Sequence, residues 1–367
     1  MIKGNFDIPL DFFNTTTPAM FGVDISTSAI KMVELTQISK QHEFQIERYV
    51  IEPLPQDAVV DGNIINLDVV SEALQRAYQR FDSRVKAVAL ALPAATVITK
   101  RIMLPSGLRE DELEYQVEAE ASQYIPFALD EVNLDFHVIG PSLGVAGEIE
   151  VLLAASRKAN VEDRVAAAQF AGLKAAVVDV EPYAEEAAFD LIRGQLPDLT
   201  ADQCVALIDI GANVMNLNIL RDGQSVYTRD QPIGGAVLTQ QIQQFYNLNW
   251  AEAETAKLNG GLPEDYSRDV LRPFLENVAG EVARALQFFF SSTQKFTEVS
   301  YVVLAGGCAV LAGLDENVAE RTQVNTLVAN PFAQMKLASR VKLDQLQLDA
   351  PALMIACGLA LRRFDLA

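Results

Sequence analysis

Two aspartates, Asp24 and Asp209, each stand at the end of an apolar stretch and are followed by small, turn-forming residues. These small residues are Ser26, Thr27 and Ser28 in the first stretch and Gly211, Ala212 and Asn213 in the second. Small residues let the backbone turn so tightly that its N–H groups can face a phosphate. An aspartate at a strand tip can hold hydrated Mg²⁺, which prefers oxygen ligands and keeps its waters. The two stretches therefore predict one phosphate-binding hairpin used twice, with both aspartates reaching the metal through water.

A third stretch, from Tyr301 to Gly313, is again an apolar strand that ends in glycines, here Gly306 and Gly307. Bare glycine backbone allows a ligand to lie flat against it. Taken singly, an aspartate at a strand end is usually a turn former or a helix cap, and a glycine pair is usually a loop. The order and spacing of the three stretches favour a nucleotide held between two related halves, with the nucleoside on the glycine pair.

The elements that position the first hairpin are expected to form one lobe. Apolar and alternating patterns predict strands over 29–35, 44–50 and 85–92, and a helix from 67 to 81 that Asn66 caps. The segment 94–174 is expected to be an inserted small α+β unit. Its predicted elements are a strand over 96–104, a helix capped by Ser106 and stopped by Pro126, strands over 132–139 and 148–155, and a helix from Asn160 to Gly172.

The second half repeats the opening pattern. A strand over 175–181 returns to the main sheet and places Glu181 at its tip. After the second hairpin, the turn Asp222-Gly223 joins two strands, and helices follow over 238–246 and from 271 onward, with Pro273 in the first turn of the long one. The apolar segment 350–361 predicts a helix buried against the first half, and it is too short to cross a bilayer.

Composition limits the function. A chain of 367 residues suits two domains. A formal charge of −20, from 49 acidic and 29 basic residues, argues against nucleic acid or a basic membrane patch. Three unpaired cysteines and two histidines favour a reducing cytoplasm and disfavour a zinc site or a catalytic triad. The apolar tail Asn5–Phe13 could dock on the body or dip into a membrane or a partner, and the interleaved acidic residues favour docking.

The motifs, in this order, resemble the actin-like ATPase superfamily, and more narrowly the PilM family of type IV pilus inner-membrane assembly proteins. The stretches that carry the narrower resemblance include Gly22–Ser28, Asp179–Glu181, 227–231, 271–274, 286–290, 303–307, 328–332 and 349–362. The resemblance implies an α/β, two-lobed, duplicated ribonuclease-H-like fold with an inserted subdomain placed as in the division protein FtsA. The segments it implies are 1–93 and 175–200 for the first lobe, 94–174 for the inserted unit, 201–245 and 301–349 for the second lobe, 246–300 for its helical part, and 350–367 for the C-terminal helix.

The resemblance also implies partners and further site residues. ATP and Mg²⁺ are the implied cofactors, with Lys31 near the phosphates, Glu254 and Lys257 near ribose or base, and Glu181 orienting water. The implied partner is the N-terminal cytoplasmic peptide of PilN, which would hold the protein at the cytoplasmic face of the inner membrane. The candidates for its groove in the inserted unit are Val97, Leu104, Tyr124 and Phe127.

Three departures from the superfamily pattern bear on catalysis. Ser26 stands where many members have glycine, and Asn213 and Met215 stand where threonines are common. We therefore expect ATP binding with slow hydrolysis at most. The alternatives are a phosphotransferase of the sugar or acetate kinase type, for which no acceptor motif is present, and a filament-forming, FtsA-like cytoskeletal ATPase.

Overall fold

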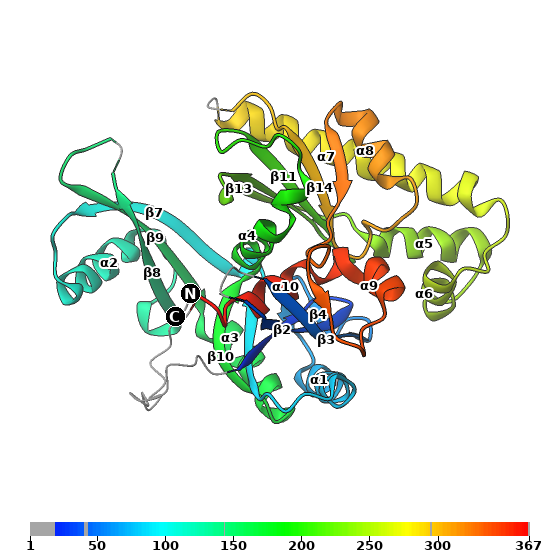
Figure 1. Cartoon of the computed structure of the whole chain (residues 1–367), viewed down its shortest axis with the longest axis horizontal. Coiled ribbons are helices and arrows are strands. Elements are labelled where there is room, and N and C mark those ends of the chain that lie inside the picture. Colours follow the sequence, from blue (N-terminus) through cyan, green and yellow to red (C-terminus); the bar gives the residue numbers. More distant parts are fainter. Residues whose placement is uncertain (1–18, 40–42, 143, 294–295, 366–367) are drawn as a thin grey trace. The chain divides into compact units, whose positions relative to one another are not determined.

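The computed structural model describes residues 19–39, 43–142, 144–293 and 296–365. The docking expected for Asn5–Phe13 lies outside these residues. Contacts divide the chain into two units. Figure 1 shows the helices and strands of the chain. Unit 1 comprises the described residues within 1–35, 48–184 and 356–367, and unit 2 comprises the described residues within 36–47 and 185–355.

The elements follow one another as strands and helices in both halves. The first half contains β1 (Met20–Ile25), β2 (Ala29–Gln37), β3 (Phe44–Pro53), β4 (Val59–Val60), β5 (Asn63–Ile64), α1 (Leu67–Phe81), β6 (Ala87–Leu92), β7 (Val97–Pro105), α2 (Glu110–Tyr124), β8 (Val132–Pro141), β9 (Glu148–Arg157), α3 (Lys158–Phe170) and β10 (Lys174–Val180). The second contains α4 (Glu181–Ile192), β11 (Cys204–Ile210), β12 (Met215–Arg221), β13 (Gln224–Gln231), α5 (Gly235–Tyr246), α6 (Trp250–Asn259), α7 (Arg272–Thr293), β14 (Tyr301–Ala305), α8 (Leu314–Thr322), β15 (Asn325–Val328), β16 (Lys336–Leu337), α9 (Leu343–Asp349) and α10 (Met354–Leu361).

The two main sheets have the same strand order. One runs β10-β6-β1-β2-β3-β16 and the other β15-β14-β11-β12-β13. The strand that carries the aspartate, β1 or β11, pairs antiparallel with the next strand along the chain and parallel with β6 or β14. Apart from β16, the sheets match strand for strand, which confirms the predicted duplication.

Each main sheet packs helices against its apolar face. In unit 1, α1 and α3 cover the core beneath β1, and Asn66 caps α1 by accepting a hydrogen bond from the Val69 amide, as predicted. In unit 2, α7 buries an apolar stripe against the sheet, and Pro273 lies in its first turn. This burial agrees with the sequence, in which the apolar residues of these helices recur at helical spacing.

A separate three-stranded sheet, in the order β7-β9-β8, packs against α2. Two predicted helix caps here are wrong. Helix α2 begins four residues after Ser106, because the Glu112 carboxylate accepts a hydrogen bond from the Arg109 amide and closes the first turn there. Helix α3 begins at Lys158, and the Asn160 side chain donates to the Ser156 hydroxyl instead of capping.

The apolar C-terminal segment forms α10, buried as predicted against β1 and α4. Two glycines permit the approach. A Cβ on Gly22 would lie 2.1 Å from the Ala356 carbonyl oxygen, and one on Gly358 would lie 1.7 Å from that of Ala184. Backbones can pack this closely only where the side chain is absent. No helix among the described residues is long and apolar enough to cross a membrane.

Candidate functional site

The first hairpin joins β1 to β2 through a turn closed by Ser26. Its amide and its hydroxyl both donate to the Ala29 carbonyl oxygen, at 3.0 and 2.9 Å. Asp24 is 1% exposed, and its Oδ2 lies 2.9 Å from the Nζ of Lys31, its cross-strand neighbour. The lysine offsets the charge of a carboxylate that burial would otherwise penalise.

The second hairpin repeats this turn at equivalent positions. The Gly211 amide donates to the Val214 carbonyl oxygen at 3.0 Å, and Asp209, two residues before Gly211, is buried. Its cross-strand neighbour is Asn216 instead of a lysine. The same turn with the same placement of an aspartate therefore occurs once in each unit.

Four amides at the two tips remain for a ligand. None of the hydrogen bonds among the described residues uses the N–H groups of Thr27, Ser28, Ala212 or Asn213. The amides of Ser26 and Gly211, in contrast, are occupied inside their turns. Adjacent unoccupied amides at a tight turn suit an anion, so the geometry fits phosphate at both tips.

Parallel strands carry further candidates to the edge where the hairpins lie. In unit 1, β1, β6 and β10 are parallel, and Val23 and Val178 both register with Leu90 of β6. Glu181 follows β10 as the first residue of α4. Asp24 and Glu181 therefore lie at the same carboxyl edge, which is where α/β sheets place ligands.

The equivalent edge of unit 2 brings the glycine pair to Asp209. Ala305, the last residue of β14, pairs with Asp209, and Gly306 follows with a φ of +84°. A Cβ on Gly306 would lie 2.6 Å from Asp209 Oδ1, whereas one on Gly307 would meet nothing within 4 Å. The first glycine is needed for packing, and the second presents bare backbone to open space.

Helix α5 docks on the second hairpin through its N-terminus. The amides of Gly235 and Ala236 donate to the carbonyl oxygens of Gly211 and Ala212, at 3.0 and 2.8 Å. A Cβ on Gly234 would lie 2.4 Å from the Ala212 oxygen. These bonds satisfy helix amides that would otherwise lack partners, and they fix the loop. The helix consequently begins three residues earlier than predicted.

Glu254 and Lys257, both on α6, join this assembly. Lys257 Nζ contacts Glu254 Oε2 at 2.7 Å, the Thr239 hydroxyl at 2.8 Å and the Gly235 carbonyl oxygen at 3.3 Å. The lysine side chain is 13% exposed. The pair is therefore part of a polar cluster beside the hairpin, together with Thr239, which the sequence did not single out.

Cys308 lies against the same loop. Its Sγ is 3.4 Å from the Gly211 carbonyl oxygen, and burial raises the pKa of the thiol to about 11. Lys257 opposes that rise in pKa, which agrees with the closeness of the two side chains. A thiol that stays protonated is a packing group here and a poor nucleophile.

Arg164 on α3 is a buried arginine that sequence reasoning missed. It is 1% exposed, and its Nη2 donates to the Gly62 carbonyl oxygen at 2.7 Å. Burial lowers the pKa of the guanidinium, while the charges of Glu181 and Asp24 raise it. Its position between Val161 and Ala168 on the buried stripe of the helix was the available signal.

The four residues predicted for a peptide groove divide into two kinds. Tyr124 is 40% exposed at the end of α2, and Phe127 is half-buried with the Arg157 guanidinium 4.0 Å from its ring centroid. Val97 packs in a small cluster with Leu92, and Leu104 is 3% exposed in the core of the inserted unit. Leu104 is therefore a core residue and does not line an open surface.

Comparison with known proteins identifies the chain. A family model described as "Type IV pilus assembly protein PilM" matches residues 22–364. The chain belongs to the PilM family. A chain of a solved "PilM-PilN type IV pilus biogenesis complex" is 28% identical, with a TM-score of 0.79 over 95% of this chain and 99% of that one. The resemblance stated from the motifs is thus confirmed.

More distant relatives agree with the PilM family fold. The cell division protein FtsA of Enterococcus hirae is 24% identical over 353 residues, which is 84% of this chain and 78% of FtsA. The ethanolamine utilization protein EutJ of Carboxydothermus hydrogenoformans is 18% identical, with a TM-score of 0.55 over 93% of this chain and 88% of EutJ, and shows the fold alone. The chain has the actin-like ATPase fold, as predicted.

Proposed function

We propose that this PilM-family chain is an ATP-binding scaffold of type IV pilus assembly that binds the N-terminal cytoplasmic peptide of PilN. The observation that carries the nucleotide part is the repeated hairpin, in which an aspartate and two unoccupied tip amides recur in both units. The similarity to a chain of a PilM-PilN complex supports the peptide part. A phosphotransferase is not favoured by either comparison.

The nucleotide would be held mainly by backbone. The tip amides of residues 27–28 and 212–213 would contact phosphates, and Asp24 and Asp209 would hold Mg²⁺ through its waters, since hydrated Mg²⁺ favours carboxylate oxygens. The described residues contain no group of three or more acidic, histidine or cysteine ligands. A metal bridged by phosphate and water needs no such group. Gly307 would face the nucleoside, with Glu254 and Lys257 near ribose or base.

Hydrolysis would be slow or undetectable. Glu181 lies at the edge that carries Asp24 and would orient a water, but Asn213 and Met215 stand where threonines are common in the superfamily. Nucleotide would then act by preferring one conformation of the protein over another, which changes partner affinity without turnover.

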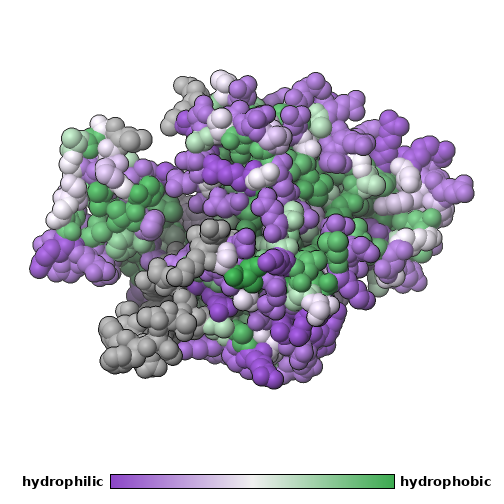
Figure 2. Space-filling view, viewed as in Figure 1, coloured by the Kyte–Doolittle hydropathy of each residue, from purple (hydrophilic) through white to green (hydrophobic). Residues whose placement is uncertain are grey.

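The PilN peptide would bind the inserted unit. Figure 2 shows hydrophobic residues gathered over its three-stranded sheet. Tyr124 at the end of α2 is 40% exposed, and Val138 on β8 is 39% exposed. Such side chains on a small unit are suited to anchor an extended peptide. Binding to PilN, a membrane protein, would place the chain at the cytoplasmic face of the inner membrane.

A peptide titration tests the PilN part of the proposal. A fluorescent PilN N-terminal peptide is titrated against the full chain with and without ATP and Mg²⁺, and against Tyr124→Ser and Tyr115→Ser. The two tyrosines lie nine residues apart, on opposite faces of α2. We expect Tyr124→Ser to weaken peptide binding about tenfold and Tyr115→Ser to have little effect. Equal affinity of the two variants would remove Tyr124 from the peptide site.

The nucleotide site is tested by ATP binding. Asp24→Asn and Asp209→Asn should each lower ATP affinity in Mg²⁺ more than in EDTA, because each removes a charge that faces the metal. An unchanged Mg²⁺ dependence in both variants would show that the aspartates do not hold the metal. Phosphoryl transfer to sugars or acetate would revive the kinase alternative, and ATP-dependent pelleting would revive the filament alternative.

A further inference from the structure

The two matching sheets differ at one edge. In the six-stranded sheet, β16 covers the outer side of β3, pairing Lys336 with Gln45 and Leu337 with Ile46 in parallel. The equivalent strand of the other sheet is β13, and within the described part of the chain no strand pairs with its outer side. The Ser225 amide at one end of this eight-residue strand donates to the Glu186 carboxylate at 2.8 Å, and the Gln231 carbonyl oxygen at the other end accepts from the Ile233 amide at 2.8 Å. Between these ends, an uncovered strand offers its outward-facing backbone donors and acceptors to another strand.

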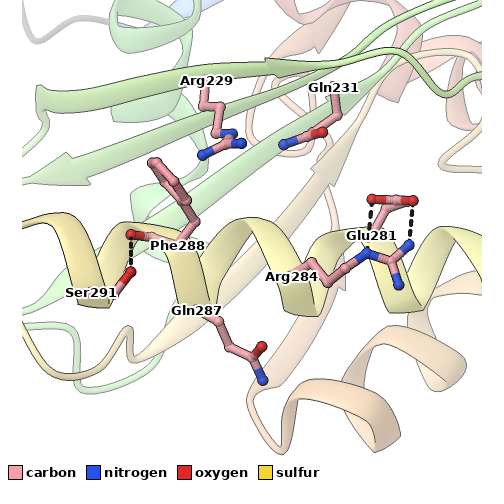
Figure 3. Close-up of a pocket in the computed structure, with 7 residues that line it drawn as sticks. All are labelled: Arg229, Gln231, Glu281, Arg284, Gln287, Phe288 and Ser291. Carbon is pink, nitrogen blue, oxygen red and sulfur yellow. Dashed lines mark hydrogen bonds and ion pairs between the residues drawn. The ribbon is translucent and has the colours of Figure 1, made fainter.

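A groove of about 530 Å³ lies beside this edge, between β13 and α7 (Figure 3). Arg229 and Gln231 point into it from the strand, and Glu281, Arg284 and Phe288 line it from the helix. Both stretches, 227–231 and 286–290, are among those by which the chain resembles its family. Neither takes part in the proposed nucleotide or peptide site.

The groove is cationic in a strongly acidic chain. The Arg229 guanidinium lies 3.6 Å from the centroid of the Phe288 ring, and no ion pair of Arg229 occurs among the described residues. Arg284 pairs with Glu281 on its own helix. Two arginines against one glutamate leave a net positive charge in the groove, whereas the chain as a whole carries −20.

Phe288 adds an apolar floor beneath Arg229. Its side chain is 49% exposed, although the neighbouring Phe289 is fully buried in the core of unit 2. The aromatic face holds the guanidinium by a cation–π contact at the edge of the groove. A guanidinium held in one plane is suited to bind a carboxylate through two parallel hydrogen bonds.

We propose that β13 accepts an added strand from an acidic, extended segment of a partner protein. The partner's backbone would pair with the outer side of β13, as β16 pairs with β3 elsewhere in this chain. Alternate side chains of the added strand would point toward α7, because successive side chains of a strand face opposite sides. A carboxylate there would meet Arg229 and Arg284, and an apolar neighbour would pack on Phe288.

The occupant is a partner segment and not a second copy because of charge. A second copy paired through its own β13 would bring a second Arg229 and a second Arg284 to the interface. Like charges across an interface oppose association, whereas an acidic segment complements the groove. This site is separate from the proposed ATP and PilN sites, so the result of its test does not depend on theirs.

The test uses the full-length chain and a phage-displayed library of random dodecapeptides. Selection on the wild type is followed by counter-selection on Arg229→Glu, and enriched peptides are synthesised and titrated. We expect acidic, β-prone sequences whose binding protects the amides of β13 from hydrogen exchange. Affinity should fall at least tenfold in Arg229→Glu, fall less in Arg229→Lys, and weaken steeply with salt.

A matched control distinguishes the effect on affinity of the charge in the groove from the effect of the chain's net charge. Arg272→Glu makes the same change on α7, twelve residues from Arg284, and should alter affinity less than twofold. Thermal unfolding of each variant shows that the fold persists. Failure to enrich acidic peptides, or protection of elements other than β13, overturns the proposal. Self-association of the wild type that Arg229→Glu abolishes would also overturn it, in favour of a second copy.

Discussion

Replacing the two adjacent glycines after β14 by alanine, one at a time, is expected to have different effects: one on stability and the other on ATP binding. Gly306 has a φ of +84°, and its Cβ would lie 2.5 Å from the Ile210 carbonyl oxygen and 2.6 Å from Asp209 Oδ1. A Cβ on Gly307 would meet nothing within 4 Å. Alanine at 306 therefore disturbs the hairpin, whereas alanine at 307 only places a methyl group where we propose that the nucleoside lies.

The size of each effect follows from these contacts. A left-handed conformation costs alanine about 1–2 kcal/mol, and overlap with rigid backbone adds about 1–3 kcal/mol. Gly306→Ala should therefore lower the free energy of unfolding by about 2–5 kcal/mol. Gly307→Ala should change that free energy by less than about 0.5 kcal/mol. It should nevertheless reduce ATP affinity about tenfold, which corresponds to about 1.4 kcal/mol of binding energy.

Urea denaturation measures the stability of both variants, and titration with a fluorescent ATP analogue measures binding to the Gly307→Ala chain. Gly306→Ala serves as the stability reference, because its effect does not depend on any ligand. Wild-type ATP affinity in a folded Gly307→Ala protein would refute the placement of the nucleoside. Wild-type stability of Gly306→Ala would refute the packing argument for the glycine pair.

Three further predictions concern catalysis, pH and packing. Steady-state ATP turnover should stay below about 1 s⁻¹, and a faster rate that Glu181→Gln abolished would contradict the scaffold function. The pKa of Cys308 is about 11, above the unfolded value near 8.5. The contribution of this thiol to stability is therefore complete below about pH 8.5 and is lost as pH rises toward 11. The stability difference between wild type and Cys308→Ala, measured by urea denaturation, should shrink over that range, and a constant difference would contradict the raised pKa. Gly358→Ala should lower the free energy of unfolding by more than about 3 kcal/mol, since its Cβ would lie 1.7 Å from the Ala184 carbonyl oxygen. Gly280→Ala, whose Cβ meets only Arg284 Nη1 at 3.7 Å, should raise that free energy by up to about 1 kcal/mol. Equal urea midpoints for the two variants would contradict the close approach of α10.

The features that sequence predicted well are those fixed by neighbouring residues. The Asp222-Gly223 turn has both residues at positive φ, as its residue types require, and Asn66 caps the helix that follows it. Both aspartate hairpins are local in the same sense. Their turns close through backbone hydrogen bonds between residues three apart, so the sequence alone is enough to place Asp24 and Asp209.

The features that sequence missed depend on distant partners. The start of α5 is set by carbonyl oxygens of Gly211 and Ala212, more than twenty residues earlier. Arg164 is buried because the Gly62 carbonyl oxygen, a hundred residues away, accepts its hydrogen bond. Leu104 was expected on a groove, but packing of β7 on α2 places it in a core. Patterns of neighbouring residues contain no information about such pairings.

The two hairpins also show which departures from the superfamily matter. Ser26 stands where glycine is common, yet its amide makes the same bond as that of Gly211, and its hydroxyl adds a second bond to Ala29. The serine therefore preserves the turn and leaves the tip amides of Thr27 and Ser28 without hydrogen bonds among the described residues, as in the second hairpin. The proposed phosphate binding would therefore not depend on a glycine at this position. The expectation of slow hydrolysis must then rest on Asn213 and Met215, where hydroxyl groups that could position water or metal are absent from the side chains.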